Sequence, residues 1–203
     1  MTSVADRIIR RIRAYSSYGS RLVFTPKDFY DFGTRTAVDQ ALSRLAKGGL
    51  LRRIGRGLYD LPRVNPILKR VAAPDVDAVV DAIARRDDVT IVANGMAAAN
   101  RLGLTTAVSA KNDYLTDGPS RTLAIGNRVV RLKHAGGKLM AMKNRPAGDV
   151  VRAIHWLGPD IANDDQVVDT LRRRLPPEVK QDLVQAKSSM TTWAARVADR
   201  VTA

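Results

Sequence analysis

The segment from Thr25 to Pro62 constrains the fold more than any other part of the chain. Thr25 is a favourable N-cap residue, and Pro26 suits the first helical position, where its missing N–H costs nothing. These residues predict a short helix over 26–32, after which Gly33 turns the chain.

A second helix is predicted from Thr34 or Arg35 to Lys47, where Gly48 and Gly49 stop it. One face is apolar at spacing i, i+3, i+4 and i+7, which is typical of a core-facing stripe. This stripe consists of Val38, Ala41, Leu42 and Leu45. The opposite, polar face consists of Arg35, Thr36, Asp39, Gln40, Ser43 and Arg44.

A basic hairpin follows this helix. Residues 50–54 and 58–61 are β-prone runs, and Gly55-Arg56-Gly57 permits a tight turn with Arg56 at its tip. Arg52 and Arg53 add positive charge beside the helix. Helix, turn, helix and basic ribbon together predict a winged helix-turn-helix, which binds DNA through its second helix.

The polar face suits contacts to bases. Arg35 can pair with guanine, Gln40 with adenine, and Thr36 with a phosphate or a thymine methyl group. Asp39 can accept from cytosine or pair with Arg35 one turn earlier, and we favour the intrahelical pair. A solvated surface is the default for one such face, but the adjoining ribbon, suited to phosphate or the minor groove, favours DNA. The residues expected to bind DNA are Thr34, Arg35, Thr36, Gln40, Ser43, Arg44, Arg52, Arg53 and Arg56.

The net charge favours a polyanionic partner. The chain has 34 Lys and Arg against 20 Asp and Glu, a net charge of +14. Residues 1–63 hold 13 basic and 5 acidic groups, residues 64–158 hold 14 and 8, and residues 159–203 hold 7 and 7. Basic character therefore fades toward the C-terminus.

Composition excludes several kinds of site. There is no cysteine, so disulfides, thiolate metal sites and cysteine nucleophiles are excluded. Two separate histidines, His134 and His155, cannot build a histidine-rich metal site. No apolar run approaches the roughly 20 residues that span a bilayer. We expect a cytoplasmic protein that is not an enzyme and needs no metal or cofactor.

The pattern along the chain predicts an α+β fold in three parts. Residues 1–63 form the winged helix-turn-helix, residues 64–158 form a mixed α/β regulatory or interaction domain with an antiparallel sheet, and residues 159–203 form C-terminal helices that pack on it. After a connector at 65–74, helices are expected over 76–86, 95–102 and 149–157. Strands are expected over 89–93, 113–116, 122–125, 129–133 and 138–142.

The C-terminal part should be helical. A helix ends at Gly158-Pro159, Asp164 or Asp165 caps the next, and Pro176-Pro177 starts the last. The last helix carries an apolar seam that covers fewer than three heptads, which favours packing within the chain over a dimer face or a face that binds another protein. The seam consists of Val179, Leu183, Ala186, Met190, Trp193 and Val197.

An enzyme is the weaker alternative. A strand, glycine turn and helix at 89–102 could cradle phosphate, but no P-loop or dinucleotide-binding motif occurs there. Asp113, Asp117 and His134 could suggest catalysis, although Asp117 before Gly118 is better explained as a turn residue. A further basic group either extends the DNA footprint or forms a solvated face. It consists of Lys133, Lys138, Lys143 and Arg145.

Two blocks of sequence carry a family resemblance. The first is LSRLAKGGL at 42–50 with GLYDLP at 57–62, and the second is NGMAAANRLGL at 94–104 with YLTDGPSR at 114–121. With both blocks the chain resembles the AbiEi family of type IV antitoxins, and more closely its short relatives of unknown function.

This resemblance implies a repressor whose winged helix binds an operator, with inverted repeats, in its own promoter. The expected partners are double-stranded operator DNA, a nucleotidyltransferase toxin and a second copy of the chain. The alternative is a toxin-neutralising interaction module with little role at DNA.

Overall fold

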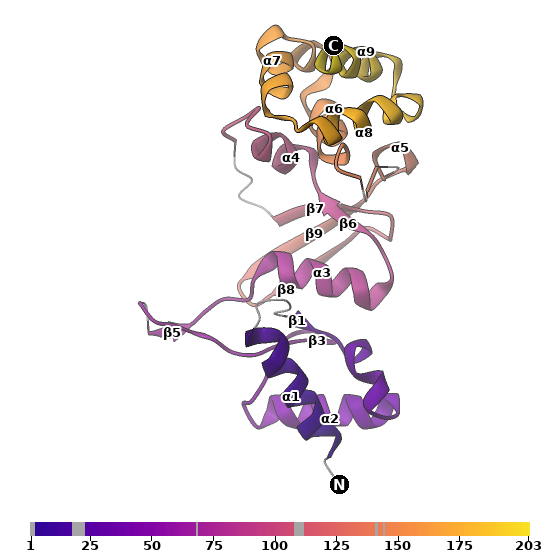
Figure 1. Ribbon diagram of the computed structural model, residues 1–203. Coiled ribbons are helices and arrows are strands. Elements are labelled where there is room, and N and C mark those ends of the chain that lie inside the picture. Colours follow the sequence, from indigo (N-terminus) through magenta and orange to yellow (C-terminus); the bar gives the residue numbers. More distant parts are fainter. Residues whose placement is uncertain (1–2, 18–22, 68, 108–111, 141, 144) are drawn as a thin grey trace. The chain divides into compact units, whose positions relative to one another are not determined.

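The computed structural model describes residues 3–17, 23–67, 69–107, 112–140, 142–143 and 145–203 (Figure 1). The chain is α+β, with helices and small antiparallel sheets. Residue contacts divide it into two compact units. The first comprises Met1–Val89 with Leu123–Val130, and the second comprises Thr90–Thr122 with Arg131–Ala203.

The first unit begins with α1 (Val4–Ser17) and then η1 (Pro26–Phe32), a 3-10 helix with the predicted bounds. The Asp28 carboxylate caps η1, because it accepts from the Thr25 backbone N–H at 2.8 Å and from the Thr25 hydroxyl at 3.2 Å. The Thr-Pro signal therefore places the start of η1 as expected.

The second predicted helix is α2 (Arg35–Lys47), and its bounds are confirmed. The Thr34 hydroxyl caps it by accepting from the Ala37 N–H at 3.3 Å. All four residues of the apolar stripe are buried. At the other end, the N–H of Gly48 donates to the Arg44 carbonyl at 2.9 Å.

Three short strands complete the N-terminal elements: β1 (Val23–Phe24), β2 (Arg52–Gly55) and β3 (Leu58–Asp60). They form an antiparallel sheet in the order β1-β3-β2. Gly57 has a φ of 65°, a conformation that favours glycine, so the predicted tight turn forms at this position. The helices and this sheet enclose one core, made of Ile8, Ile12, Phe24, Phe29, Val38, Ala41, Leu42, Leu45, Leu51 and Tyr59.

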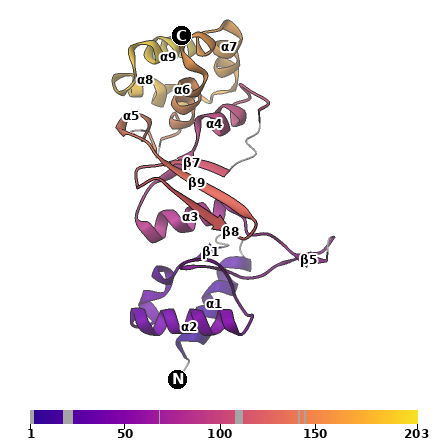
Figure 2. The same ribbon diagram turned by 180° about the vertical axis from the view of Figure 1, so that it is seen from behind.

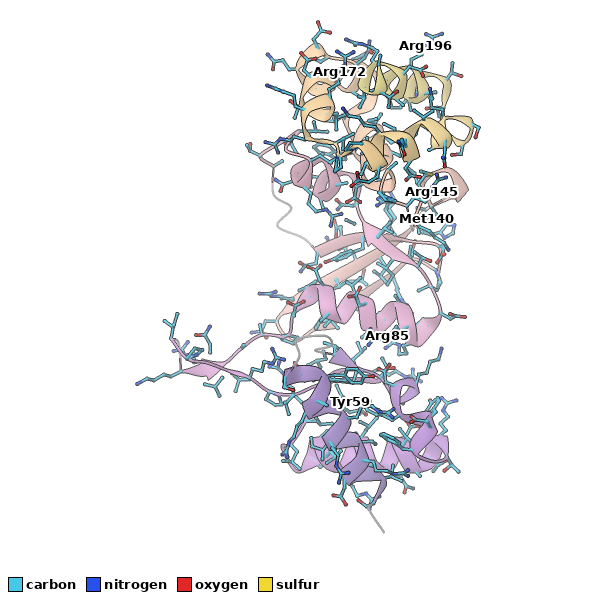
Figure 3. The ribbon with its side chains drawn as sticks, in the orientation of Figure 1. Tyr59, Arg85, Met140, Arg145, Arg172 and Arg196 are labelled. Carbon is cyan, nitrogen blue, oxygen red and sulfur yellow. The ribbon has the colours of Figure 1, made fainter. Side chains whose placement is uncertain are left out.

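A second ribbon follows where the sequence indicated only a connector. It pairs β4 (Val64–Asn65) with β5 (Arg70–Val71) in antiparallel register. Next, α3 (Val76–Asp87) packs against β1 and β3, and Arg85 donates to a β1 carbonyl at 2.9 Å. Figure 3 shows Arg85 on the side of α3 that faces these elements. Contacts therefore group α3 with the N-terminal elements, whereas the sequence placed a boundary after residue 63.

The second unit contains most of a four-stranded sheet in the order β6-β7-β9-β8. Strands β6 and β7 are antiparallel, with Ile91 opposite Thr116. An antiparallel sheet was expected in this region, but its strand pairing was not predicted. Between them, α4 (Gly95–Arg101) begins at Asn94, whose side chain accepts from the Ala97 N–H. The strands are β6 (Ile91–Ala93), β7 (Asn112–Thr116), β8 (Arg121–Ile125) and β9 (Arg128–His134).

The C-terminal helices surround an apolar core of their own. Helix α6 (Gly148–Ala162) is interrupted at Gly158, which has a φ of 80° and precedes Pro159. This break confirms the predicted stop at Gly158-Pro159. Asp164 accepts from the Gln166 N–H at 2.8 Å and caps the next helix, also as predicted. The helices are α5 (Gly137–Met140), α6 (Gly148–Ala162), α7 (Asp165–Arg174), α8 (Pro177–Ala186) and α9 (Thr192–Thr202), with a 3-10 turn, η2, at Lys187–Ser189.

The strand expected over residues 138–142 is wrong, because residues 137–140 form the single helical turn α5. Leu, Met, Ala and Lys dominate this run, and all four favour helix over strand. A mostly apolar run of five residues does not by itself distinguish a strand from a helix.

The apolar seam is divided between two helices. The chain leaves α8 at Ala186, passes through an extended Met190 and begins α9 at Thr192. Hydroxyl side chains in this stretch compete for backbone groups, and the Ser189 hydroxyl donates to the Ala186 carbonyl at 2.8 Å. The expectation of one continuous helix is therefore wrong, although the seam residues pack into the common core.

Candidate nucleic-acid interface

The polar face of α2 is exposed, as the sequence predicts. Its Thr34 hydroxyl is occupied by the helix cap, while the remaining side chains stand in solvent. The expected pair between Arg35 and Asp39 is present at 3.9 Å, on the exposed surface. Such pairs contribute under about 1 kcal/mol, so Arg35 can exchange Asp39 for an external anion at low cost. The exposed residues of this face are Thr34, Arg35, Thr36, Asp39, Gln40, Ser43 and Arg44.

Two ribbon arginines, Arg53 and Arg56, are also exposed. Arg53 lies opposite Tyr59 across the β2–β3 register, and opposed residues point to the same face of a sheet. Because Tyr59 belongs to the core formed with α1 and α2, Arg53 lies on the face of the ribbon that is turned toward these helices. The Arg56 carbonyl accepts from Arg86 of α3 at 2.5 Å, which anchors the turn.

Arg52 has a different environment from Arg53. Its guanidinium donates to both carboxylate oxygens of Asp60, at 2.9 and 2.5 Å, and to the Ala72 carbonyl at 2.9 Å. The hydrogen bond to Asp60 raises the pKa of Arg52 above its ordinary value. The structure thus separates Arg52 from the other expected DNA contacts. Gly55 lies opposite Leu58, so the pairing of Arg52 with Asp60 depends on a register shift between Arg53 and Gly55, which the sequence does not indicate.

Helix α1 uses two of its arginines internally. Arg11 donates to both oxygens of Asp31 at 2.7 Å and lies 3.8 Å from the ring centre of Phe32, while Arg7 donates to the Phe32 carbonyl. The open hollow around them is lined by Arg7, Arg10, Arg11, Ala14, Tyr15 and Phe32. These contacts fix η1 against α1 and so position α2 behind it.

The titratable cluster in the second unit has structural partners. The Asp117 carboxylate accepts from the Thr90 N–H at 2.7 Å and from Lys143 at 2.8 Å, and the ring of His134 contacts the Gly118 carbonyl at 3.0 Å. Asp113 lies 3.7 Å from Arg131. Among the residues that the structure describes, no group of three or more His, Asp or Glu side chains could hold a metal ion.

Lys143 should control the acidity of Asp117. Its hydrogen bond, with that of the Thr90 backbone, lowers the pKa of Asp117 from 3.8 to about 2. The ionised carboxylate therefore stabilises the fold above about pH 4, and this contribution is lost as the pH falls through about 2. We expect Lys143→Met to return the pKa of Asp117 toward 3.8, measured by NMR titration of the carboxyl carbon.

Lys133→Met is the matched control, because Lys133 is exposed on the neighbouring strand β9. It should leave the Asp117 titration unchanged. A midpoint that stays near 2 in Lys143→Met would show that the Thr90 backbone alone sets the pKa.

The further basic group, which consists of Lys133, Lys138, Lys143 and Arg145, is only partly available to a ligand. Lys143 is paired with Asp117, and Arg145 is paired with Asp182. Lys133 is exposed, and the side chain of Lys138 lies outside what the structure describes. The α2 face with Arg53 and Arg56 therefore provides the larger set of accessible polar and basic side chains.

Comparison with known proteins identifies a family. A model described as a family of unknown function (DUF6088) matches residues 7–182, which is most of the chain. No curated protein and no solved structure matches. In the part of the chain that the structure describes, no helix is long and apolar enough to cross a membrane.

Proposed function

The chain belongs to the DUF6088 family, and we propose that it is a sequence-specific, double-stranded-DNA-binding repressor built on a winged helix-turn-helix. One observation carries this proposal. The elements run α1-β1-η1-α2-β2-β3, and the sheet order is β1-β3-β2. This arrangement presents α2 with its polar face free, followed directly by a basic ribbon, as helix-turn-helix proteins present a recognition helix.

In this proposal α2 enters the major groove. Arg35, Thr36 and Gln40 contact base edges near the start of the helix, where recognition helices meet DNA. Thr34, whose hydroxyl caps the helix, brings the N-terminal N–H groups toward a phosphate. Further along the exposed face, Ser43 and Arg44 contact the backbone or the next base pair.

The ribbon arginines hold the DNA backbone in this proposal. Arg53 and Arg56 are exposed and basic, so each is suited to one phosphate. Each phosphate contact adds about one unit to the slope of log affinity against log salt. Arg52 is not assigned such a contact, because Asp60 already neutralises it.

Repression follows if the bound site overlaps a promoter. The resemblance to AbiEi antitoxins favours autoregulation at an operator with inverted repeats, bound by two copies of the chain. The basic excess in residues 1–63 supports attraction to DNA in this part of the molecule.

Replacing Gln40 and Arg44 together by alanine should weaken binding to the upstream DNA of the gene. Both side chains are exposed on α2, and losing the base contact of Gln40 costs about 1–3 kcal/mol. Losing Arg44 removes a contact to the backbone or the next base pair. We therefore expect specific affinity to fall at least roughly tenfold, with a smaller loss on unrelated DNA. Fluorescence anisotropy with both DNA fragments, at two salt concentrations, measures this difference.

Arg196→Ala is the matched control, since Arg196 is an exposed arginine of α9 at the outer surface of the second unit (Figure 3). It should bind like the natural protein. Equal affinity of the natural protein for upstream and unrelated DNA would contradict the proposed function.

A second candidate function is neutralisation of a nucleotidyltransferase toxin. Three large apolar side chains of the C-terminal helices are exposed, namely Trp156, Ile161 and Val184, and residues 159–203 are electrically balanced. Both features suit a protein partner better than DNA. Growth rescue by the full-length Gln40 and Arg44 double variant, co-expressed with a neighbouring nucleotidyltransferase, would support this candidate.

A further inference from the structure

The β4–β5 ribbon is a defined arm that extends away from α1, α2 and α3 (Figures 1 and 2). Asn65 holds Ile67 and Lys69, two of the described residues between the two strands, in place. The Asn65 side chain accepts from the Ile67 N–H at 2.9 Å, and the Asn65 carbonyl accepts from the Lys69 N–H at 2.9 Å. Lys69 itself takes a left-handed conformation with a φ of 49°. Ile67 and Lys69 are therefore held by specific hydrogen bonds to Asn65.

Large apolar side chains of the arm stand in solvent. Ile67, in the loop, is 87% exposed, and the opposed strand residues Val64 and Val71 are 65% and 54% exposed. Scattered exposed apolar residues are ordinary, but three within eight residues form a group that marks an interaction site.

The charge of the arm is of one sign. Between Asp60 and Asp75 the sequence contains Arg63, Lys69 and Arg70 and no acidic residue. Of these, Lys69 and Arg70 are exposed beside the loop. An apolar tip flanked only by positive charge is complementary to a polyanion with an apolar interior, which describes stacked base pairs between phosphates.

The base of the arm is fixed to the first unit. Arg52, held by Asp60, donates to the Ala72 carbonyl at 2.9 Å. The Ala72 N–H donates to the Arg63 carbonyl at 2.8 Å, and the Arg63 side chain donates to the Ser16 carbonyl at 3.0 Å. This bracing keeps the arm projected without a partner.

We propose that this arm enters the minor groove of the DNA that α2 binds, and that Ile67 acts as a wedge at a base step. The inference rests on the proposed DNA-binding function. Proteins that bind the minor groove insert Ile, Leu or Pro between base pairs, unstack them and bend the duplex by about 20–90°. Pro66 and Ile67 supply such a tip, and Lys69 and Arg70 lie beside it for the flanking phosphates.

A second copy of the chain is a less suitable occupant. Each arm strand is two residues long, which offers little edge for pairing with another sheet. Lys69 and Arg70 would also meet their own like charges in a symmetric arm-to-arm contact. DNA, by contrast, can contact the apolar residues with its bases and the charged residues with its phosphates.

Ile67→Ser in the full chain tests the wedge. A fragment of the upstream DNA of the gene is labelled with a fluorescent dye at each end. Energy transfer between the two dyes then reports how far the protein bends the DNA on binding. We expect the natural protein to bend the fragment and Ile67→Ser to reduce the bend by roughly half or more, with less than about a tenfold loss of affinity. Val184→Ser, an equally simple change at an exposed apolar residue of α8, should bend DNA normally.

A second variant tests the charges. Replacing Lys69 and Arg70 by glutamine should lower the salt slope of binding by about two units. The inference is overturned if the natural protein binds its operator without bending it, or if Ile67→Ser bends it equally. Gel filtration that shows Ile67→Ser dissociating a dimer would assign the arm to a protein contact instead. Absence of any specific binding by the natural protein would instead refute the proposed function.

Discussion

Gly95→Ala is expected to destabilise the second unit, so that it unfolds at urea concentrations at which the natural chain is still folded. A Cβ atom at position 95 would lie 2.4 Å from the Trp156 Cβ and 2.6 Å from the Arg152 carbonyl oxygen, whereas real Cβ contacts essentially never fall under 3.0 Å. The two helix backbones would have to separate, because one of the atoms is main chain. Helices α4 and α6 approach closely through small buried residues, Ala98, Ala99 and Ala153. We expect the free energy of unfolding to fall by about 3 kcal/mol.

Urea denaturation followed by tryptophan fluorescence measures this loss. Both tryptophans of the chain, Trp156 and Trp193, belong to the second unit, so their emission reports its unfolding. Gly136→Ala is the matched control, since a Cβ there would meet no atom within 4 Å. It should shift stability by less than about 0.5 kcal/mol. Identical urea midpoints for the two variants would contradict the packing argument.

The close approach of α4 and α6 shows what the sequence could and could not indicate. The run of small residues after Gly95 predicts close packing on a sheet, but the structure packs α4 against helix α6. The close packing is therefore confirmed and its partner was wrong, because a contact between residues 95 and 156 depends on the tertiary fold. Local signals worked well by comparison. Thr25 with Pro26, and the break at Gly158, act within a few residues and were recoverable from the sequence.

The two incorrect secondary-structure predictions, the strand over residues 138–142 and the continuous last helix, also have physical causes. Residues 138–142 form a short, mostly apolar run that is compatible with either a strand or a helix, and helix propensity prevailed. In the apolar seam, spacings of three and four residues continued across Met190, although the backbone there is extended. A short break preserves the spacing while changing the direction of the chain, so periodicity alone could not detect it.

The candidate site was predictable as a surface but not residue by residue. Burial of the α2 stripe fixes which face is exposed, so the polar face followed directly from the pattern. In the ribbon, both Arg52 and Arg53 were predicted to bind DNA because both are positively charged. They are neighbours on strand β2, however, and neighbouring residues of a strand point to opposite faces. The arm was missed because two-residue strands carry no periodic signal.

Arg52→Ala is accordingly expected to lower stability, not to remove a DNA contact. The side chain of Asp60 is 8% exposed and that of Arg52 is 29% exposed, so the variant leaves a buried carboxylate without its cation. Removing one partner of a buried pair costs about 3 kcal/mol, and here the base of the β4–β5 arm also loses its bond at Ala72. Scanning calorimetry, which detects unfolding of either unit, should show a lower transition temperature.

Arg53→Ala provides the matched comparison, because it changes the same residue type one position along the strand. Arg53 is exposed, so its loss should leave the transition temperature nearly unchanged and lower the salt slope of DNA binding by about one unit. Arg52→Ala, assayed at a temperature where it is folded, should retain the full salt slope. If Arg52→Ala instead lost one unit of slope at unchanged stability, Arg52 would be a phosphate contact, and its pairing with Asp60 would be exchanged on binding. Of the two neighbouring arginines, Arg52 is therefore expected to stabilise the ribbon, and Arg53 is expected to contact DNA.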